Sequence, residues 1–261
     1  MQRIIWILFV LTIISSQADA RTWHIQPDGT GDAPTIDAAI DSSVAGDVIE
    51  LACGTYHEEG LVVKSGITIR SETGQPDCAT IQGRQIPNRP GSIFYTWGSD
   101  NTTLLEGLTI TGGLANDNFY GVTGGGMVIS SGSELTVKRC LITGNSARAA
   151  GGVIIIESHV TFIDCVITEN GATHSSPGGV NVVGNSSLSA YNTTIISNIA
   201  ASFWPVDGYV ALDSEAYFNC CDIDRTWWQF VGGANYEVDD SDCGEVADEA
   251  QNWGSLKALY R

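Results

Sequence analysis

Few residues in this chain combine types and spacing that could do chemistry. Lys138 and Arg139 follow an apolar alternation, and Asp164 stands at the position equivalent to Arg139 in the next similar segment of the chain. A base beside carboxylates that hold Ca²⁺ could remove a proton from an acidic sugar, but no second carboxylate joins this pair. We therefore predict no catalytic residue, and a surface ion pair that contributes less than about 1 kcal/mol.

Aromatic side chains are the second group with a chemical use. Exposed rings bind carbohydrates by stacking on a sugar, while the sugar hydroxyls bond to nearby polar groups. Several rings lie in loop-like segments, and we select as candidate carbohydrate contacts Trp204, Trp227 and Trp228. The alternative is that these rings pack against the protein wall, which is the more usual fate of aromatic side chains.

Acidic residues dominate the charge of the chain. Thirty Asp and Glu against 12 Lys and Arg give a net charge of −18 over 261 residues. Such a surface repels phosphate backbones, so we exclude nucleic acid as a partner. Asp239, Asp240 and Asp242 lie close together but lack the spacing of a complete calcium loop. We expect them to attract Ca²⁺ weakly, and we expect no cofactor.

The N-terminal segment decides the expected location. A positive charge at Arg3 precedes an apolar run over Ile4–Ile14, and an Ala-x-Ala cleavage site ends at Ala20. This order is typical of a signal peptide, and the run is too short to span a membrane. We expect residues 1–20 to be removed and the rest to be secreted, extracellular or at the cell surface, without a membrane span. The periplasm is the alternative location.

The elements that must position these residues repeat along the chain. Each repeat begins with alternating apolar residues, continues with Cys or Thr and a further apolar pair, and ends at Asn. The copies run over 135–145, 160–170 and 188–198, and a degenerate fourth copy starts at 216. The interval between successive starts is therefore nearly constant. Between the copies a Gly-Gly-apolar signature recurs at 125, 151 and 178. Short runs of period 2 between Gly, Asn and Ser predict strands.

Whole units that repeat with the same residue types in register are typical of a solenoid in which each unit is one coil. We predict an all-β, single-stranded right-handed parallel β-helix of about seven coils over residues 48–224. The alignment stacks Leu135, Val160, Leu188 and Ala216 in one inward ladder, Ile142, Ile167 and Ile195 in another, and Asn145, Asn170 and Asn198 at one turn. We expect these asparagines to tolerate left-handed geometry and the Gly-Gly pairs to supply positive φ at a second turn.

Both ends of a solenoid need covering. Residues 21–47 are the predicted N-terminal cap, with a short amphipathic helix within Pro34–Ser43. Residues 225–261 lose the repeat and form the predicted C-terminal cap and acidic tail.

The coil length also predicts a disulfide. Cys53 and Cys78 are separated by the length of one coil, so they lie one above the other at a spacing that suits a disulfide. Cys140 and Cys165 have the same separation but occupy ladder positions, where a free Cys behaves as a small buried hydrophobe. Cys243 is expected to pair with Cys220 or Cys221, and spacing does not choose between them.

The repeats resemble a known family. The Gly-Gly-apolar elements and the segment Phe162–Asn170 are similar to repeats of polymorphic outer-membrane proteins. With the stretch Trp23–Tyr56, they make the chain resemble bacterial secreted right-handed β-helix repeat proteins of the pectin-lyase-like superfamily over nearly all of 22–224. The resemblance implies the fold and a bacterial source.

Activity is not implied by the resemblance, because this superfamily holds lyases, hydrolases, epimerases and inert adhesins. The Asp, Gly-His-Gly and Arg-x-Lys elements of its polygalacturonase-type hydrolases do not occur in the coils. We therefore expect an exported, non-catalytic β-helix protein that binds a polysaccharide or another cell-surface component. The alternative is a uronate-polysaccharide lyase or a glycoside hydrolase.

Overall fold

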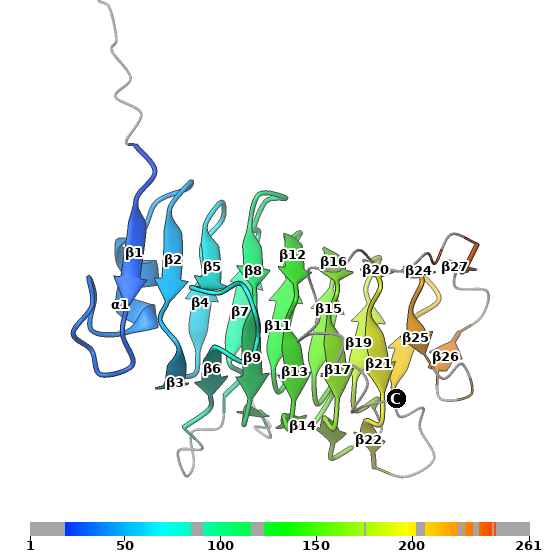
Figure 1. Ribbon diagram of the computed structural model, residues 1–261. Coiled ribbons are helices and arrows are strands. Elements are labelled where there is room, and N and C mark those ends of the chain that lie inside the picture. The colour runs from blue at the N-terminus through cyan, green and yellow to red at the C-terminus, as the bar shows by residue number, and fades with distance from the viewer. Residues whose placement is uncertain are drawn as a thin grey trace, which may run out of the picture.

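The chain winds into a solenoid of parallel strands, seen from the side in Figure 1. The structure is a computed structural model, and it describes residues 19–84, 91–115, 123–174, 176–201, 207–223, 226, 228–231, 235–241 and 243. Within these ranges the strands form four sheets, and every pair of neighbouring strands is parallel. Of the predicted signal peptide, residues 1–18 lie outside the described part.

Sheet A, the longest sheet, runs from one end of the solenoid to the other. Its strands are β1 (Thr22–Ile25), β2 (Val48–Leu51), β5 (Thr68–Ser71), β8 (Leu104–Glu106), β12 (Glu134–Lys138), β16 (His159–Ile163), β20 (Ser187–Tyr191), β24 (Glu215–Asn219) and β27 (Asn235–Asp239). The parallel sheet therefore extends to both sides of 48–224, because β1 pairs with β2 and β27 pairs with β24.

The other three sheets complete each coil. Sheet B contains β3 (Gly54–His57), β6 (Ala79–Gln82), β9 (Leu108–Thr111), β13 (Leu141–Thr143), β17 (Val166–Thr168), β21 (Thr194–Ile196) and β25 (Asp222–Ile223). Sheet C contains β4 (Leu61–Val63), β7 (Phe94–Trp97), β11 (Met127–Ser130), β15 (Val153–Ile156), β19 (Val180–Val183), β23 (Gly208–Val210) and β26 (Trp228–Phe230). Sheet D consists of the very short strands β10 (Leu114–Ala115), β14 (Ser146–Ala147), β18 (Gly171–Ala172) and β22 (Ile199–Ala200).

The described strands confirm about seven coils, because sheets B and C each have seven strands. Like residues stack in register as predicted: Leu135 pairs with Val160, which pairs with Leu188 and then Ala216. The isoleucine ladder on sheet B is confirmed in the same way. Ile167 is fully buried in its centre, between Ile142 and Ile195. One apolar core therefore runs along the inside of the solenoid.

The N-terminal end is covered by the predicted helix, α1 (Ile36–Ser42). The side chain of Thr35 accepts a hydrogen bond from the backbone nitrogen of Ala38, which is an N-cap. Ile36, Ala39 and Ile40 are buried against the core. In the described part of the chain, no helix has the length and apolar character needed to cross a membrane.

An asparagine ladder lines the turn between sheets B and D. The Nδ2 atoms of Asn145 and Asn170 donate to the Oδ1 atoms of Asn170 and Asn198, each at 3.0 Å, and all three residues are buried. The expectation that these asparagines are left-handed is wrong. The positive φ falls on the preceding residue, at 56° for Glu169 and 59° for Ser197, so that each amide can point inward along the axis.

The Gly-Gly pairs are required because a Cβ atom at these positions would clash with the backbone of the next coil. This corrects the prediction that they supply positive φ. Neither Gly125 nor Gly151 has a φ in the left-handed region. A Cβ atom on Gly125 would lie 2.8 Å from the backbone nitrogen of Ser146 and still closer to the carbonyl oxygen of Gly151. Adjacent coils therefore approach so closely at this corner that no side chain fits.

Two disulfides tie the ends of the solenoid. One joins Cys53 to Cys78, as the one-coil spacing predicts, with a Cα–Cα distance of 4.3 Å. The other joins Cys220 to Cys243, which resolves the choice that the sequence left open. Cys140 and Cys165 are buried and form no disulfide, and burial raises the pKa of the Cys140 thiol well above its usual value. These thiols pack as small apolar side chains.

Removing the first disulfide should destabilise the protein measurably. We expect the paired variant Cys53→Ala/Cys78→Ala to lose about 3 kcal/mol of unfolding free energy, because a closed loop of this length restricts the unfolded chain. Denaturant titration measures the loss. Peptide mapping of the non-reduced wild-type protein is the control, and a free thiol at Cys53 or Cys78 would contradict the pairing.

Candidate functional site

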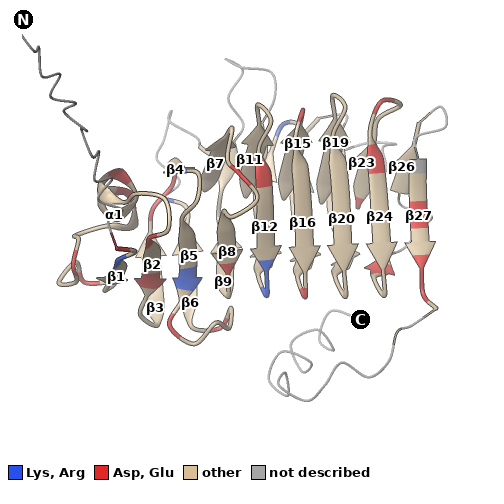
Figure 2. Cartoon of the chain, turned by 90° about the horizontal axis from the view of Figure 1, so that it is seen from above, with Lys and Arg blue, Asp and Glu red and all other residues tan. Residues whose placement is uncertain are grey.

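The outer face of sheet A has a different character at its two ends (Figure 2). Toward the N-terminus, charged residues of alternating sign stack on successive strands. Arg70 lies 2.7 Å from Glu50, and Lys138 lies 3.6 Å from Glu106. Each of these basic side chains is therefore paired with a carboxylate of an adjacent coil. We call this row of ion pairs the electrostatic ladder, and it helps to hold the coils together.

Arg139 belongs to the same ladder, and its predicted ion pair with Asp164 is wrong. Its guanidinium lies 2.6 Å from the Glu106 carboxylate and also donates to the carbonyl oxygen of Gly74 at 2.9 Å. Asp164 accepts a hydrogen bond from Asn192 at 2.6 Å. The Arg139 side chain therefore reaches back to the two preceding coils and not forward to the coil of Asp164.

Toward the C-terminus, the same face carries tyrosines. Tyr191 on β20 and Tyr217 on β24 point outward on adjacent coils, with ring centroids 5.7 Å apart and planes inclined by 55°. Tyr191 is 38% exposed and Tyr217 is partly exposed. Glu237 on β27 lies beside Tyr217 in the next coil. Two solvent-facing rings at one strand spacing form a platform for a planar or puckered ring ligand.

Two shallow depressions adjoin this tyrosine pair. The first, of about 450 Å³, is lined by Ser187, Leu188, Ser189, Glu215, Ala216, Tyr217, Tyr236 and Glu237. The second, of about 390 Å³, is lined by His159, Asn185, Ser186, Ser187, Leu212, Asp213, Ser214 and Glu215. Because Ser187 and Glu215 belong to both, the depressions form one groove across β16, β20, β24 and β27. We call this surface the tyrosine groove.

Polar groups in the tyrosine groove are fixed by their neighbours. The Ser187 hydroxyl lies 2.6 Å from Nδ1 of His159, one coil away. Burial, followed by the charges of Asp239 and Glu237, raises the pKa of Tyr217, so its phenol stays protonated at neutral pH. Hydrogen bonds from Ser241 lower the pKa of Asp239, which stays ionised. The groove therefore combines hydroxyl donors with carboxylate acceptors, the groups that recognise sugar hydroxyls.

Of the three tryptophans selected from the sequence, the structure describes Trp228, and its ring is not part of this face. Trp228 is 6% exposed, which corrects its selection as a carbohydrate contact. Its ring packs edge-on against Phe218 at 5.0 Å and stacks on Phe230 at 5.9 Å, and Phe230 stacks on Tyr236 at 4.0 Å. Trp228 belongs to the apolar core and Phe230 packs against it, so these rings cover the C-terminal end of the core among the described residues. Trp204 and Trp227 lie outside the described residues.

The predicted calcium ligands do not assemble into a described site. Asp239 uses one carboxylate oxygen to accept from the backbone and hydroxyl of Ser241, a local turn contact. Asp240 is exposed, and Asp242 lies outside the described residues. In the part of the chain that the structure describes, the potential ligand atoms that gather within 4.8 Å of one another belong to Cys53, Glu72 and Cys78.

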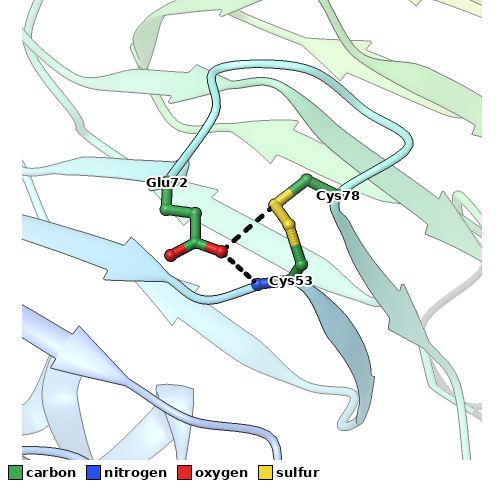
Figure 3. A group of neighbouring side chains, drawn as sticks. All are labelled: Cys53, Glu72 and Cys78. Carbon is green, nitrogen blue, oxygen red and sulfur yellow. Dashed lines mark hydrogen bonds between the residues drawn. A yellow bond between two sulfur atoms is a disulfide. The ribbon is translucent and has the colours of Figure 1, made fainter.

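The Cys53, Glu72 and Cys78 group has another role (Figure 3). Its two sulfurs are joined in the disulfide, so neither is a thiolate that could bind a metal. Oε1 of Glu72 accepts a hydrogen bond from the backbone nitrogen of Cys53 at 2.9 Å and lies 3.9 Å from Sγ of Cys78. Glu72 therefore fixes the strand end that carries the disulfide.

The tyrosine groove was not found from the sequence, although the repeats contained the signal. Tyr191 stands in the register of Lys138 and Ile163, and Tyr217 in the register of Thr136 and Thr161. Both positions point outward, because the residues between them form the inward ladder. Asking which outward positions become aromatic in the later repeats would have selected these two tyrosines.

The sheet topology and the family comparison agree on the class of protein, which is a right-handed parallel β-helix. The family model described as "Right handed beta helix region" matches residues 53–200, and the chain belongs to this family. A comparison with curated proteins gave no match.

Solved structures of similar shape include two pectin methylesterases. The deglycosylated enzyme from Aspergillus niger is 15% identical, with a TM-score of 0.47, and the match covers 88% of this chain and 95% of that one. The enzyme from Erwinia chrysanthemi is 12% identical, with a TM-score of 0.43, and the match covers 95% of this chain and 96% of that one.

Proposed function

We propose that this protein binds a polysaccharide outside the cell and that the tyrosine groove is the binding surface. The observation that carries the proposal is the outward pair of Tyr191 and Tyr217, which adjoins a depression lined by hydroxyls and carboxylates. Aromatic rings supply apolar contact with a sugar, while fixed polar groups orient its hydroxyls. Both rings stand on the outward side of sheet A, where Tyr191 is 38% exposed and Tyr217 is partly exposed, so a ligand can reach them from solvent.

Export is supported by the two disulfides, because such bonds persist in oxidising compartments. A signal peptide at residues 1–20 would deliver the chain there. We propose that the protein then reaches the cell surface or the medium. Retention in the periplasm is the alternative.

Binding without catalysis is the function that the described contacts favour over a uronate lyase. A lyase base must be available to its substrate, yet Arg139 bonds to Glu106 and Gly74. Lys138 also lies beside Glu106. We therefore expect no unsaturated product, measured by ultraviolet absorbance, when the protein is incubated with uronate polysaccharides and Ca²⁺.

The tyrosine groove can be tested with a glycan array. We expect wild-type protein to retain one class of polysaccharide, and Tyr217→Ala and Tyr191→Ala each to weaken that binding about tenfold, which is the loss of one stacking contact. Trp97→Ala is the matched control, because this ring is 55% exposed on sheet C, away from the groove. The proposal would be contradicted if the wild-type protein bound no polysaccharide on the array, or if both tyrosine variants bound as tightly as the wild type.

A further inference from the structure

We infer that the tyrosine groove selects polysaccharides with free amino groups, such as glucosamine polymers, and rejects uronate polymers. This inference rests on the proposed function and adds the class of ligand to it. The reasoning starts from which charges line the groove and which charges are too far away to neutralise them.

Carboxylates are the charged groups along the C-terminal part of the groove. Glu215 belongs to both depressions, Glu237 lines the first and Asp213 lines the second, and all three are exposed. Asp239 lies beside Tyr217 in the next coil and influences its ionisation. No Lys or Arg is among the described residues that line either depression. A uronate chain would place its own negative charges against these carboxylates, which is unfavourable.

The basic residues of the same face lie elsewhere and are paired. Arg70 bonds to Glu50, and Arg139 and Lys138 lie against Glu106. The strand β12, which carries Lys138, is three strands from β24, which is about 14 Å along the sheet. Since the Debye length at physiological ionic strength is about 8 Å, these paired cations hardly alter the field at β24 and β27, where the carboxylates of the groove lie.

The shape of the groove suits a linear chain of sugars. It crosses four neighbouring strands, β16, β20, β24 and β27, so it extends about 14 Å along the solenoid axis. Tyr191 and Tyr217 are diagonal neighbours on adjacent strands, with ring centroids 5.7 Å apart, so neighbouring sugars of one chain can each contact a ring. Ammonium groups on successive sugars would then meet the carboxylates of successive coils, while the protonated Tyr217 hydroxyl donates to a sugar oxygen.

Three oligosaccharides of matched length separate charge from shape. Glucosamine oligomers carry amines, their N-acetylated forms have the same backbone without charge, and galacturonate oligomers are anionic. By isothermal titration we expect the glucosamine oligomer to bind at least about tenfold more tightly than its acetylated form, with an affinity that falls as salt is added. We expect no binding of the galacturonate oligomer.

The double variant Glu215→Gln/Glu237→Gln tests the cause. It should lower the affinity for the glucosamine oligomer to that of the acetylated form, with little effect on the acetylated form itself. Glu134→Gln is the matched control, because this exposed glutamate lies on the same face but three strands from Glu215. Equal binding of the charged and acetylated oligomers, or binding of galacturonate, would overturn the inference and leave the proposed function standing. Failure of all three to bind would overturn the inference, whereas the proposed function falls only if the glycan array also shows no binding.

Discussion

Replacing Ile167 by Asp should abolish cooperative folding. Ile167 is fully buried between Ile142 and Ile195, so the variant places an unpaired carboxylate inside the core with no partner in the adjacent coils. The desolvation penalty of such a charge exceeds a large part of the stability of a typical domain. Circular dichroism during denaturant titration should show no sharp transition.

A matched control separates burial from charge. Thr161→Asp adds the same carboxylate to the outward side of the neighbouring strand β16, where Thr161 is only partly buried. We expect this variant to unfold cooperatively, with a midpoint close to that of the wild type. A soluble Ile167→Asp protein with wild-type melting would show that the inward assignment is wrong.

The asparagine ladder should be the second most sensitive feature. Nδ2 of Asn170 lies within 3.0 Å of the carbonyl oxygens of Ile142 and Thr168 and of Oδ1 of Asn198. Its Oδ1 accepts from the backbone and side chain of Asn145. Asn170→Ala would leave several of these buried groups unsatisfied, so we expect a loss of about 3 kcal/mol or more.

Denaturant titration measures this loss as well, and Asn101→Ala is the control because it removes the same atoms from an exposed turn. We expect the control to change stability by less than about 0.5 kcal/mol. Equal stability of the two variants would mean that the asparagine ladder does not contribute to the free energy of unfolding.

The coil architecture was predictable because parallel stacking places each residue directly above its counterpart one repeat earlier. The nearly constant interval between repeats therefore determined both ladders and the Cys53–Cys78 pairing, and the register confirms them. The repeat period carries no information about backbone clearance at the corners. This is why a positive φ was expected at Gly125, and why left-handed geometry was expected at Asn170 when it falls on Glu169.

The tyrosine groove escaped prediction for a related reason. A repeat alignment emphasises what the copies share, and shared residues form the core, whereas Tyr191 and Tyr217 are departures from the repeat on its outward side. Trp228 was selected because its ring lies in a loop-like segment. Trp228 instead packs edge-on against Phe218 at the C-terminal end of the described core.

Hydroxyl-radical footprinting with mass spectrometry tests the central claim most directly, because it reports the solvent exposure of individual aromatic side chains. The protein is labelled alone and with the saccharide that it retains most strongly on the array. The account predicts that Tyr191 and Tyr217 become protected while Trp97, exposed on another sheet, is labelled equally in both states. Protection of Trp97 without protection of the tyrosines, or no change at any of the three, would contradict it.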